Sequence, residues 1–213
     1  MITITLAIII LTVIISLTAN SNQKVIDDLI FYPPAITQRQ QWYRFLSCAL
    51  IHADLIHLAF NMWAFYSFGR ALEVYYKQLF GSKGSLLFLA TYIIAQVVCL
   101  LPTYFKHKND YQYRSLGASG AVSAIVFATI FLIPQQEIGI LFIPFGIPGF
   151  IFAFIYLGIT MYMSKRGQDN INHSAHFWGA LAGVVLLIVF CYAFSTFNPI
   201  QNFAFQVRNY IGF

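Results

Sequence analysis

The sequence predicts an all-α, polytopic membrane protein that crosses the bilayer six times. Of its 213 residues, 59% are hydrophobic and 9% are charged, whereas a soluble domain carries about 25% charged residues. The mean hydropathy is +0.71, and at about 20 residues per spanning helix the chain has room for six or seven spans. This composition excludes a disordered chain and argues against an ordinary soluble enzyme.

Six apolar segments follow one another along the chain, and we interpret each of them as a membrane span. The first is interpreted as a span rather than a signal peptide, because it lacks the positive residues that usually precede a signal's apolar stretch. No internal repeat or second domain is visible, so residues 1–213 are expected to form one domain. The predicted spans are residues 2–19, 55–72, 85–104, 116–132, 150–163 and 173–194.

Two regions outside the spans differ in character from short polar loops. Residues 20–54 form a long mixed connection, and its aromatic and basic stretch Trp42-Tyr43-Arg44 is typical of a membrane interface. Residues 195–213 form a polar and aromatic tail. We therefore expect the first connection to be associated with the membrane.

Charge and cysteine content narrow the function classes. The net charge is +5, but the basic residues are scattered singly and in pairs, so the chain lacks the basic stripe of a nucleic-acid-binding protein. Cys48, Cys99 and Cys191 are odd in number and far apart, which favours buried thiols over a disulfide framework or a metal site.

Unusual polar residues occur near the beginnings of spans two, four and six. These three spans cross in the same direction, so their N-terminal ends lie in the same leaflet. A polar group inside a membrane is costly and usually faces a partner or a wet cavity. The five residues therefore indicate one shared site; they are His57, Asn61, Ser119, His173 and His176.

Small residues could bring Ser119 and His176 together. Ser119 lies in the sequence Gly117-Ala118-Ser119-Gly120, and His176 is followed by Gly179 and Gly183. Such residues let helices approach closely, and a serine needs an adjacent base to become a nucleophile. The alternative is that the serine and the histidine serve helix packing alone.

His57 and Asn61 are spaced four residues apart, on one face of a helix. Two side-chain donors directed at one point would stabilise negative charge developing on an oxygen; the alternative is a polar clamp between helices. A metal site using His52, His57, His173 and His176 is disfavoured, because no Asp or Glu lies beside them within spans two, four and six.

These three motifs, in this order on spans two, four and six, resemble those of the rhomboid family of intramembrane serine proteases. The resemblance extends from about Trp42 to Gly183. It implies that Ser119 is the nucleophile and His176 the general base of a dyad without an acidic member. His57, Asn61 and the Ser119 backbone N–H would form the oxyanion site, and no cofactor is implied.

The resemblance also implies a substrate and a route to the site. The substrate would be another membrane protein, cut in or near its transmembrane segment, with span five as the lateral gate and the first connection as a membrane-embedded loop. Apart from the resemblance, the position of the dyad near the beginnings of its spans predicts a small wet cavity open to that side, lined by Ser115, Ser119, Ser123, Asn172, His173 and Ser174. The alternative function is a non-catalytic binder of membrane proteins, and the oligomeric state is not indicated.

Two positions depart from the family pattern. Where the family often has Trp-Arg in the first loop, this chain has Tyr43-Arg44, with Trp42 one place earlier. Where many members place an aromatic ring against the histidine, one turn after the nucleophile, this chain has Ser123, whose hydroxyl is expected to hydrogen-bond His176.

The distribution of charge and the family resemblance predict opposite orientations of the chain in the membrane. Eight Lys and Arg residues lie on the side of the site and four on the opposite side, which would place the site in the cytoplasm. The resemblance implies that the site faces outward, and we follow it. The compact chain favours a bacterial inner membrane.

Overall fold

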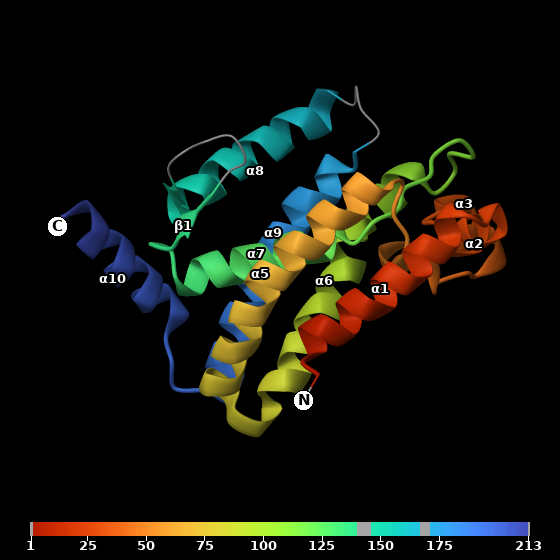
Figure 1. The fold of residues 1–213 in the computed structure, drawn as a ribbon. Coiled ribbons are helices and arrows are strands. Elements are labelled where there is room, and N and C mark those ends of the chain that lie inside the picture. The colour runs from red at the N-terminus through yellow and green to blue at the C-terminus, as the bar shows by residue number, and fades with distance from the viewer. Residues whose placement is uncertain (1, 140–145, 167–170, 213) are drawn as a thin grey trace.

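The computed structural model describes residues 2–139, 146–166 and 171–212, and these form an almost entirely helical fold (Figure 1). Short 3-10 helices η1 and η2 connect some of the α-helices. The elements are α1 (Ile4–Asn20), α2 (Gln23–Leu29), α3 (Pro33–Arg39), α4 (Arg44–Ser47), η1 (Cys48–Leu50), α5 (Leu55–Phe80), η2 (Gly81–Lys83), α6 (Gly84–His107), α7 (Ser119–Leu132), α8 (Gly149–Arg166), α9 (His173–Phe194) and α10 (Pro199–Ile211). Strands β1 (Glu137–Ile138) and β2 (Ile147–Pro148) pair antiparallel.

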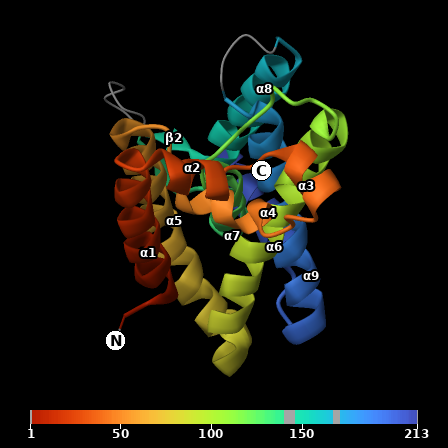
Figure 2. The ribbon, with the colours of Figure 1, turned by 90° about the vertical axis from the view of Figure 1, so that its right-hand side faces the viewer.

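Helix α7 lies at the centre of the bundle, in contact with α5, α6 and α9. Helix α1 packs on α5, and α8 packs on α9. In the view turned by 90°, α2, α3 and α4 of the first connection lie across the face of the bundle that is turned toward the viewer (Figure 2). Most α7 side chains are buried, so this helix is enclosed by its neighbours.

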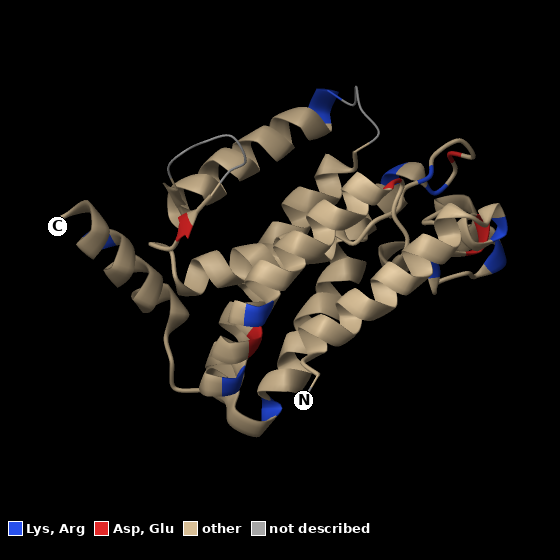
Figure 3. Cartoon of the chain, viewed as in Figure 1, with Lys and Arg blue, Asp and Glu red and all other residues tan. Residues whose placement is uncertain are grey.

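Apolar side chains cover the outer faces of the surrounding helices. Ile14 of α1, Trp63 of α5, Phe154 of α8 and Val189 of α9 are each about half exposed or more. Most charged residues lie toward the ends of the helices and in the connections, with a few farther inside α5 (Figure 3). An apolar belt with charged ends matches the surface of a membrane protein.

Two described stretches are long and apolar enough to cross a membrane. An 18-residue window within Leu55–His107, which holds α5 and α6 in succession, has a mean hydropathy of 2.1, and one within His173–Phe194 has a mean hydropathy of 2.3. The apolar helices α1 and α7 are shorter, at 17 and 14 residues. Length and apolarity therefore identify fewer crossings than the six that the sequence predicts.

The helices and connections differ from the predicted ones in several places. Helix α5 continues to Phe80, well beyond residue 72. Helix α7 begins at Ser119 rather than at residue 116, because Gly117 has φ +114° and interrupts a right-handed helix. The first connection contains three short α-helices, and the tail contains α10, whose Asn198 caps its first turn.

Helices α7 and α9 touch through their glycines. A Cβ on Gly179 would collide with the Gly120 carbonyl, and one on Gly183 with the Ala124 carbonyl. Gly120 in turn has the Cys99 sulfur where its own Cβ would be. The predicted small-residue faces thus meet backbone to backbone, and all three cysteines are buried free thiols.

A buried carboxylate fixes α1 to α5. Glu73 of α5 accepts hydrogen bonds from the backbone N–H groups of Ile4 and Thr5 and from the Thr5 hydroxyl, at 2.8–3.2 Å. Lys77 pairs with it at 3.0 Å. The N–H groups of the first turn of α1 lack intrahelical partners, and Glu73 supplies two of them with an acceptor.

Candidate active site

Ser119 and His176 face each other across the α7–α9 contact. Ser119 Oγ lies 2.6 Å from His176 Nε2, although the two residues are 57 positions apart. Ser119 is the first residue of α7 and His176 lies in the first turn of α9. If His176 carries its ring proton on Nδ1, Nε2 accepts the serine proton, which is the arrangement a nucleophile and its base require.

The turn before Ser119 is held by backbone contacts. The Gly117 N–H donates to the Cys48 carbonyl at 2.9 Å, and the positive φ of Gly117 turns the chain into α7. As the first residue of the helix, Ser119 has a backbone N–H without an intrahelical acceptor. The unpaired type of backbone N–H found at a helix start and the Ser119 hydroxyl therefore lie together at the N-terminal end of α7.

His57 and Asn61 lie on the first turns of α5, next to this helix end. A Cβ on Gly117 would stand 2.9 Å from His57 Cε1, so the imidazole lies directly against the Gly117 backbone. The His57 N–H is capped by Asp54 at 2.7 Å. Asn61 donates one of its two amide protons to the His57 carbonyl, which leaves a second donor on the same group.

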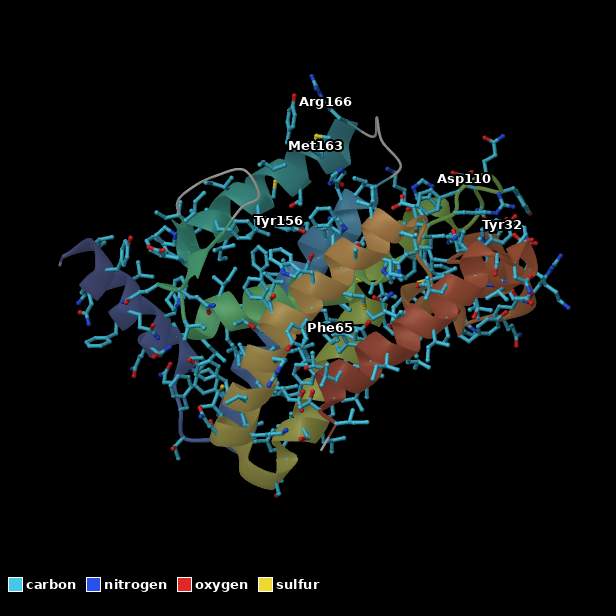
Figure 4. All side chains as sticks on the ribbon, viewed as in Figure 1. Tyr32, Phe65, Asp110, Tyr156, Met163 and Arg166 are labelled. Atoms are coloured by element: carbon cyan, nitrogen blue, oxygen red, sulfur yellow. The ribbon has the colours of Figure 1, made fainter. Side chains whose placement is uncertain are left out.

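The expected partner of Ser123 is corrected by the structure. Its hydroxyl lies 3.0 Å from the hydroxyl of Tyr156 on α8, and the Tyr156 ring stacks near His176, with centroids 6.5 Å apart and planes at 22°. Figure 4 marks Tyr156 on α8. The aromatic neighbour of the histidine is therefore supplied by α8, and Ser123 holds it in place.

Arg44 ties the first connection together. Its side chain is buried, and it donates to the carbonyls of Asp27 and Ile30 at 2.9 and 2.7 Å and to the Gln41 side chain at 2.6 Å. Trp42 lies beside Phe45 and Tyr104. The first connection is thus an ordered structure, and the Arg44 guanidinium anchors it by donating to uncharged carbonyl groups.

Three cavities meet the site, and they divide the residues expected to line a single wet cavity. A polar cavity of about 590 Å³ is lined by Ser115, Asn172, His173 and Ser174, among others. An apolar groove of about 570 Å³ between α5, α7 and α8 is lined by Ser119, Ser123 and Asn61. A small cavity of about 20 Å³ touches Ser115, Ser119 and Asn172, and so lies between the other two.

Several site features were not predicted from the sequence. Tyr156 stands in an apolar segment with nothing to distinguish it, and its role depends on contacts with α7 and α9. The sequence offers His52 only as a candidate metal ligand, yet it is buried and hydrogen-bonds Ser16 and the Ala118 N–H. The only sequence signal for a role of His52 was its position five residues before His57.

Comparison with known proteins gives one consistent result. A family model described as a rhomboid domain matches residues 39–193. Presenilin-associated rhomboid-like protein A, mitochondrial, of Danio rerio is 30% identical over 137 residues, which cover 62% of this chain and 33% of that protein. Rhomboid-like protein 15 of Arabidopsis thaliana is 29% identical over 180 residues, covering 80% and 41%.

A human relative gives the same picture. Presenilin-associated rhomboid-like protein, mitochondrial, of Homo sapiens is 29% identical over 137 residues, covering 62% of this chain and 34% of that protein. The chain thus spans between a third and two fifths of the length of these three relatives.

Proposed function

Because the chain belongs to the rhomboid family, we propose that it is an intramembrane serine endopeptidase that cuts transmembrane segments of other membrane proteins. The observation that carries the proposal is the 2.6 Å contact between Ser119 Oγ and His176 Nε2. Within a rhomboid domain, a serine at a helix start and a histidine at this distance can act as nucleophile and base.

The proposed reaction proceeds by acyl transfer. His176 takes the proton of Ser119, and the Ser119 oxygen attacks the carbonyl carbon of the scissile peptide bond. His176 then gives the proton to the leaving amine, and an acyl-enzyme forms. A water molecule, deprotonated by His176, attacks the ester, and His176 returns that proton to the Ser119 oxygen as the second product leaves.

Negative charge on the carbonyl oxygen would be stabilised by three donors. These are His57, the free amide proton of Asn61 and the Ser119 backbone N–H. The contact between His57 and Gly117 supports this assignment, because it holds the imidazole beside the turn that carries the nucleophile. Preorganised donors of this kind are each worth about 10²–10³ in kcat.

The groove between α5 and α8 is the proposed entrance for the substrate segment. Its walls include Phe60, Trp63, Phe127 and Phe152, and an apolar wall suits a segment arriving from lipid. Following the family resemblance, we propose α8 as the movable side, and the hydrogen bond between the Tyr156 and Ser123 hydroxyls, which holds α8 to α7, would have to open when the segment enters. A substrate helix must unwind there to expose a carbonyl.

The proposal includes six membrane crossings, by α1, α5, α6, α7, α8 and α9. Helix α7 is enclosed on its sides by α5, α6 and α9, so its small length does not expose its backbone ends to lipid. A plasma membrane, with the site facing outward, is the proposed location, although relatives carry the word mitochondrial in their names. Reporter fusions after Lys83 and at the C-terminus test the orientation.

Purified variants in liposomes test the dyad. We expect Ser119→Ala and His176→Ala each to abolish both cleavage of a transmembrane substrate and labelling by a fluorophosphonate probe. Ser67→Ala removes another hydroxyl from the same groove, and it should keep both activities. Cleavage by either dyad variant would refute the mechanism, and an unreactive wild-type protein that still binds transmembrane segments would favour the non-catalytic binder.

A further inference from the structure

His52 is a buried polar residue that the proposed mechanism does not use. It lies between η1 and α5 with 5% of its surface exposed. Its Nδ1 is 3.0 Å from the Ser16 hydroxyl on α1, and its Nε2 is 3.5 Å from the backbone N of Ala118. One ring therefore bridges the outer helix α1 and the residue that directly precedes Ser119.

The hydrogen-bond network assigns the tautomer of this ring. The Ser16 hydroxyl has one proton, and it donates that proton to the Leu50 carbonyl at 2.9 Å. Ser16 must therefore accept from His52, which places the ring proton on Nδ1. Nε2 is then an acceptor, and the Ala118 N–H donates to it.

Two contacts of this segment converge on the nucleophile's turn. Ala118 is the N-cap residue of α7, and its N–H binds His52 while the N–H of Gly117 binds the Cys48 carbonyl. The His52 ring also meets the His57 ring edge to face, with centroids 5.0 Å apart. A shift of His52 would thus move both the nucleophile and a proposed oxyanion donor.

We propose that His52 is a positioning residue of the proposed reaction, held in its Nδ1-protonated form by Ser16 so that Nε2 fixes the Ala118 peptide. The inference rests on the proposed protease function. The inference gives a role to α1, although α1 supplies neither the proposed dyad nor the proposed oxyanion donors. Ser16 of α1 sets the tautomer of His52, and the geometry of the turn before Ser119 depends on that tautomer.

Two substitutions of His52 separate positioning from simple anchoring of α1. An asparagine amide can take the place of Nδ1–H and keep the bond to Ser16, but it does not reach Ala118. A glutamine carbonyl can take the place of Nε2 and accept from Ala118. Positioning predicts a higher kcat for His52→Gln than for His52→Asn, whereas anchoring of α1 predicts the reverse order.

A matched pair on α1 gives an independent measurement. Ser16→Ala removes the acceptor that sets the tautomer. Thr12→Val removes a buried hydroxyl one turn earlier, which has no hydrogen-bond partner in the part of the chain that the structure describes. We expect Ser16→Ala to lower kcat about tenfold with KM unchanged, as for a misplaced reacting group, and Thr12→Val to match the wild type.

The assay measures kcat, KM and the rate of fluorophosphonate labelling in liposomes, with thermal unfolding of each variant alongside. The positioning role is overturned if His52→Asn is at least as active as His52→Gln, or if Ser16→Ala and Thr12→Val lose the same activity. A wild-type protein that neither cleaves nor labels overturns the protease function and the positioning role together. If the wild type is active and the two His52 variants have the same kcat as the wild type, the positioning role alone is overturned.

Discussion

Gly117→Ala tests how the turn before α7 controls the proposed oxyanion site. At φ +114°, alanine is strained, which costs about 1–3 kcal/mol of folding free energy. Its Cβ would stand 2.9 Å from His57 Cε1 and 3.1 Å from Nε2. Ordinary contacts are about 3.5–4.0 Å, so the imidazole must move by roughly 0.5–1 Å.

That displacement sets the expected effect on catalysis. A misplacement of about 1 Å can cost about 10² in rate, and losing an oxyanion donor costs about 10²–10³. We therefore expect Gly117→Ala to lower kcat by about 10–100-fold with little change in KM. The assay is cleavage of a transmembrane substrate in liposomes, with the thermal unfolding midpoint measured on the same preparations.

Gly81→Ala is the matched control for backbone strain. Gly81 also has a positive φ, +57°, but nothing lies within 4 Å of its Cβ position, and it lies at the C-terminal end of α5, at the opposite end from His57. It should lose stability while keeping kcat. Wild-type kcat in Gly117→Ala, or an equal loss in Gly81→Ala, would refute the reasoning.

Three further predictions concern the scaffold. Arg44→Ala, which leaves the Asp27 and Ile30 carbonyls without their donor, should destabilise the first connection by about 2–3 kcal/mol, measured as faster proteolysis within residues 20–43. Glu73→Ala leaves the Ile4 and Thr5 N–H groups and the Thr5 hydroxyl without their acceptor, and should destabilise the protein by about 1–3 kcal/mol, read from thermal unfolding with Glu73→Gln as the milder comparison. Burial, followed by the nearby charge of His57, lowers the pKa of His52 to about 4. Its stabilising contribution is therefore complete above about pH 6.5 and is lost as pH falls toward 4, by about 3 kcal/mol in total, and the pH dependence of unfolding should flatten in His52→Gln.

The helical fold could be predicted from the sequence because burial in lipid leaves a local signal. Runs of apolar residues mark the helices, and α9 matches its predicted span of 173–194. The boundaries around α7 could not be predicted, because the start at Ser119 depends on the backbone angle of Gly117. Apolarity gives no sign of where inside an apolar run a helix begins.

The site was predictable where its residues share a helix or a motif. Spacing linked His57 to Asn61, and small residues indicated the close approach of α7 and α9. The link between Ser123 and Tyr156 was not predictable, because it joins residues 33 positions apart on helices whose relative rotation no local pattern records. The task of His52 was missed for the same reason, since its partners lie 36 and 66 positions away.

The shortness of α7 supports the proposed hydrolysis within a membrane. At 14 residues, α7 is about 21 Å long, against a hydrocarbon thickness of about 30 Å. If its far end reaches one interface, Ser119 lies about 9 Å below the other. The polar cavity and the small cavity share Ser115 and Asn172, and the small cavity and the apolar groove share Ser119. Water arriving through the polar side and a transmembrane segment arriving through the groove would therefore meet at the Ser119 hydroxyl, and a longer α7 would move that meeting point out of the bilayer.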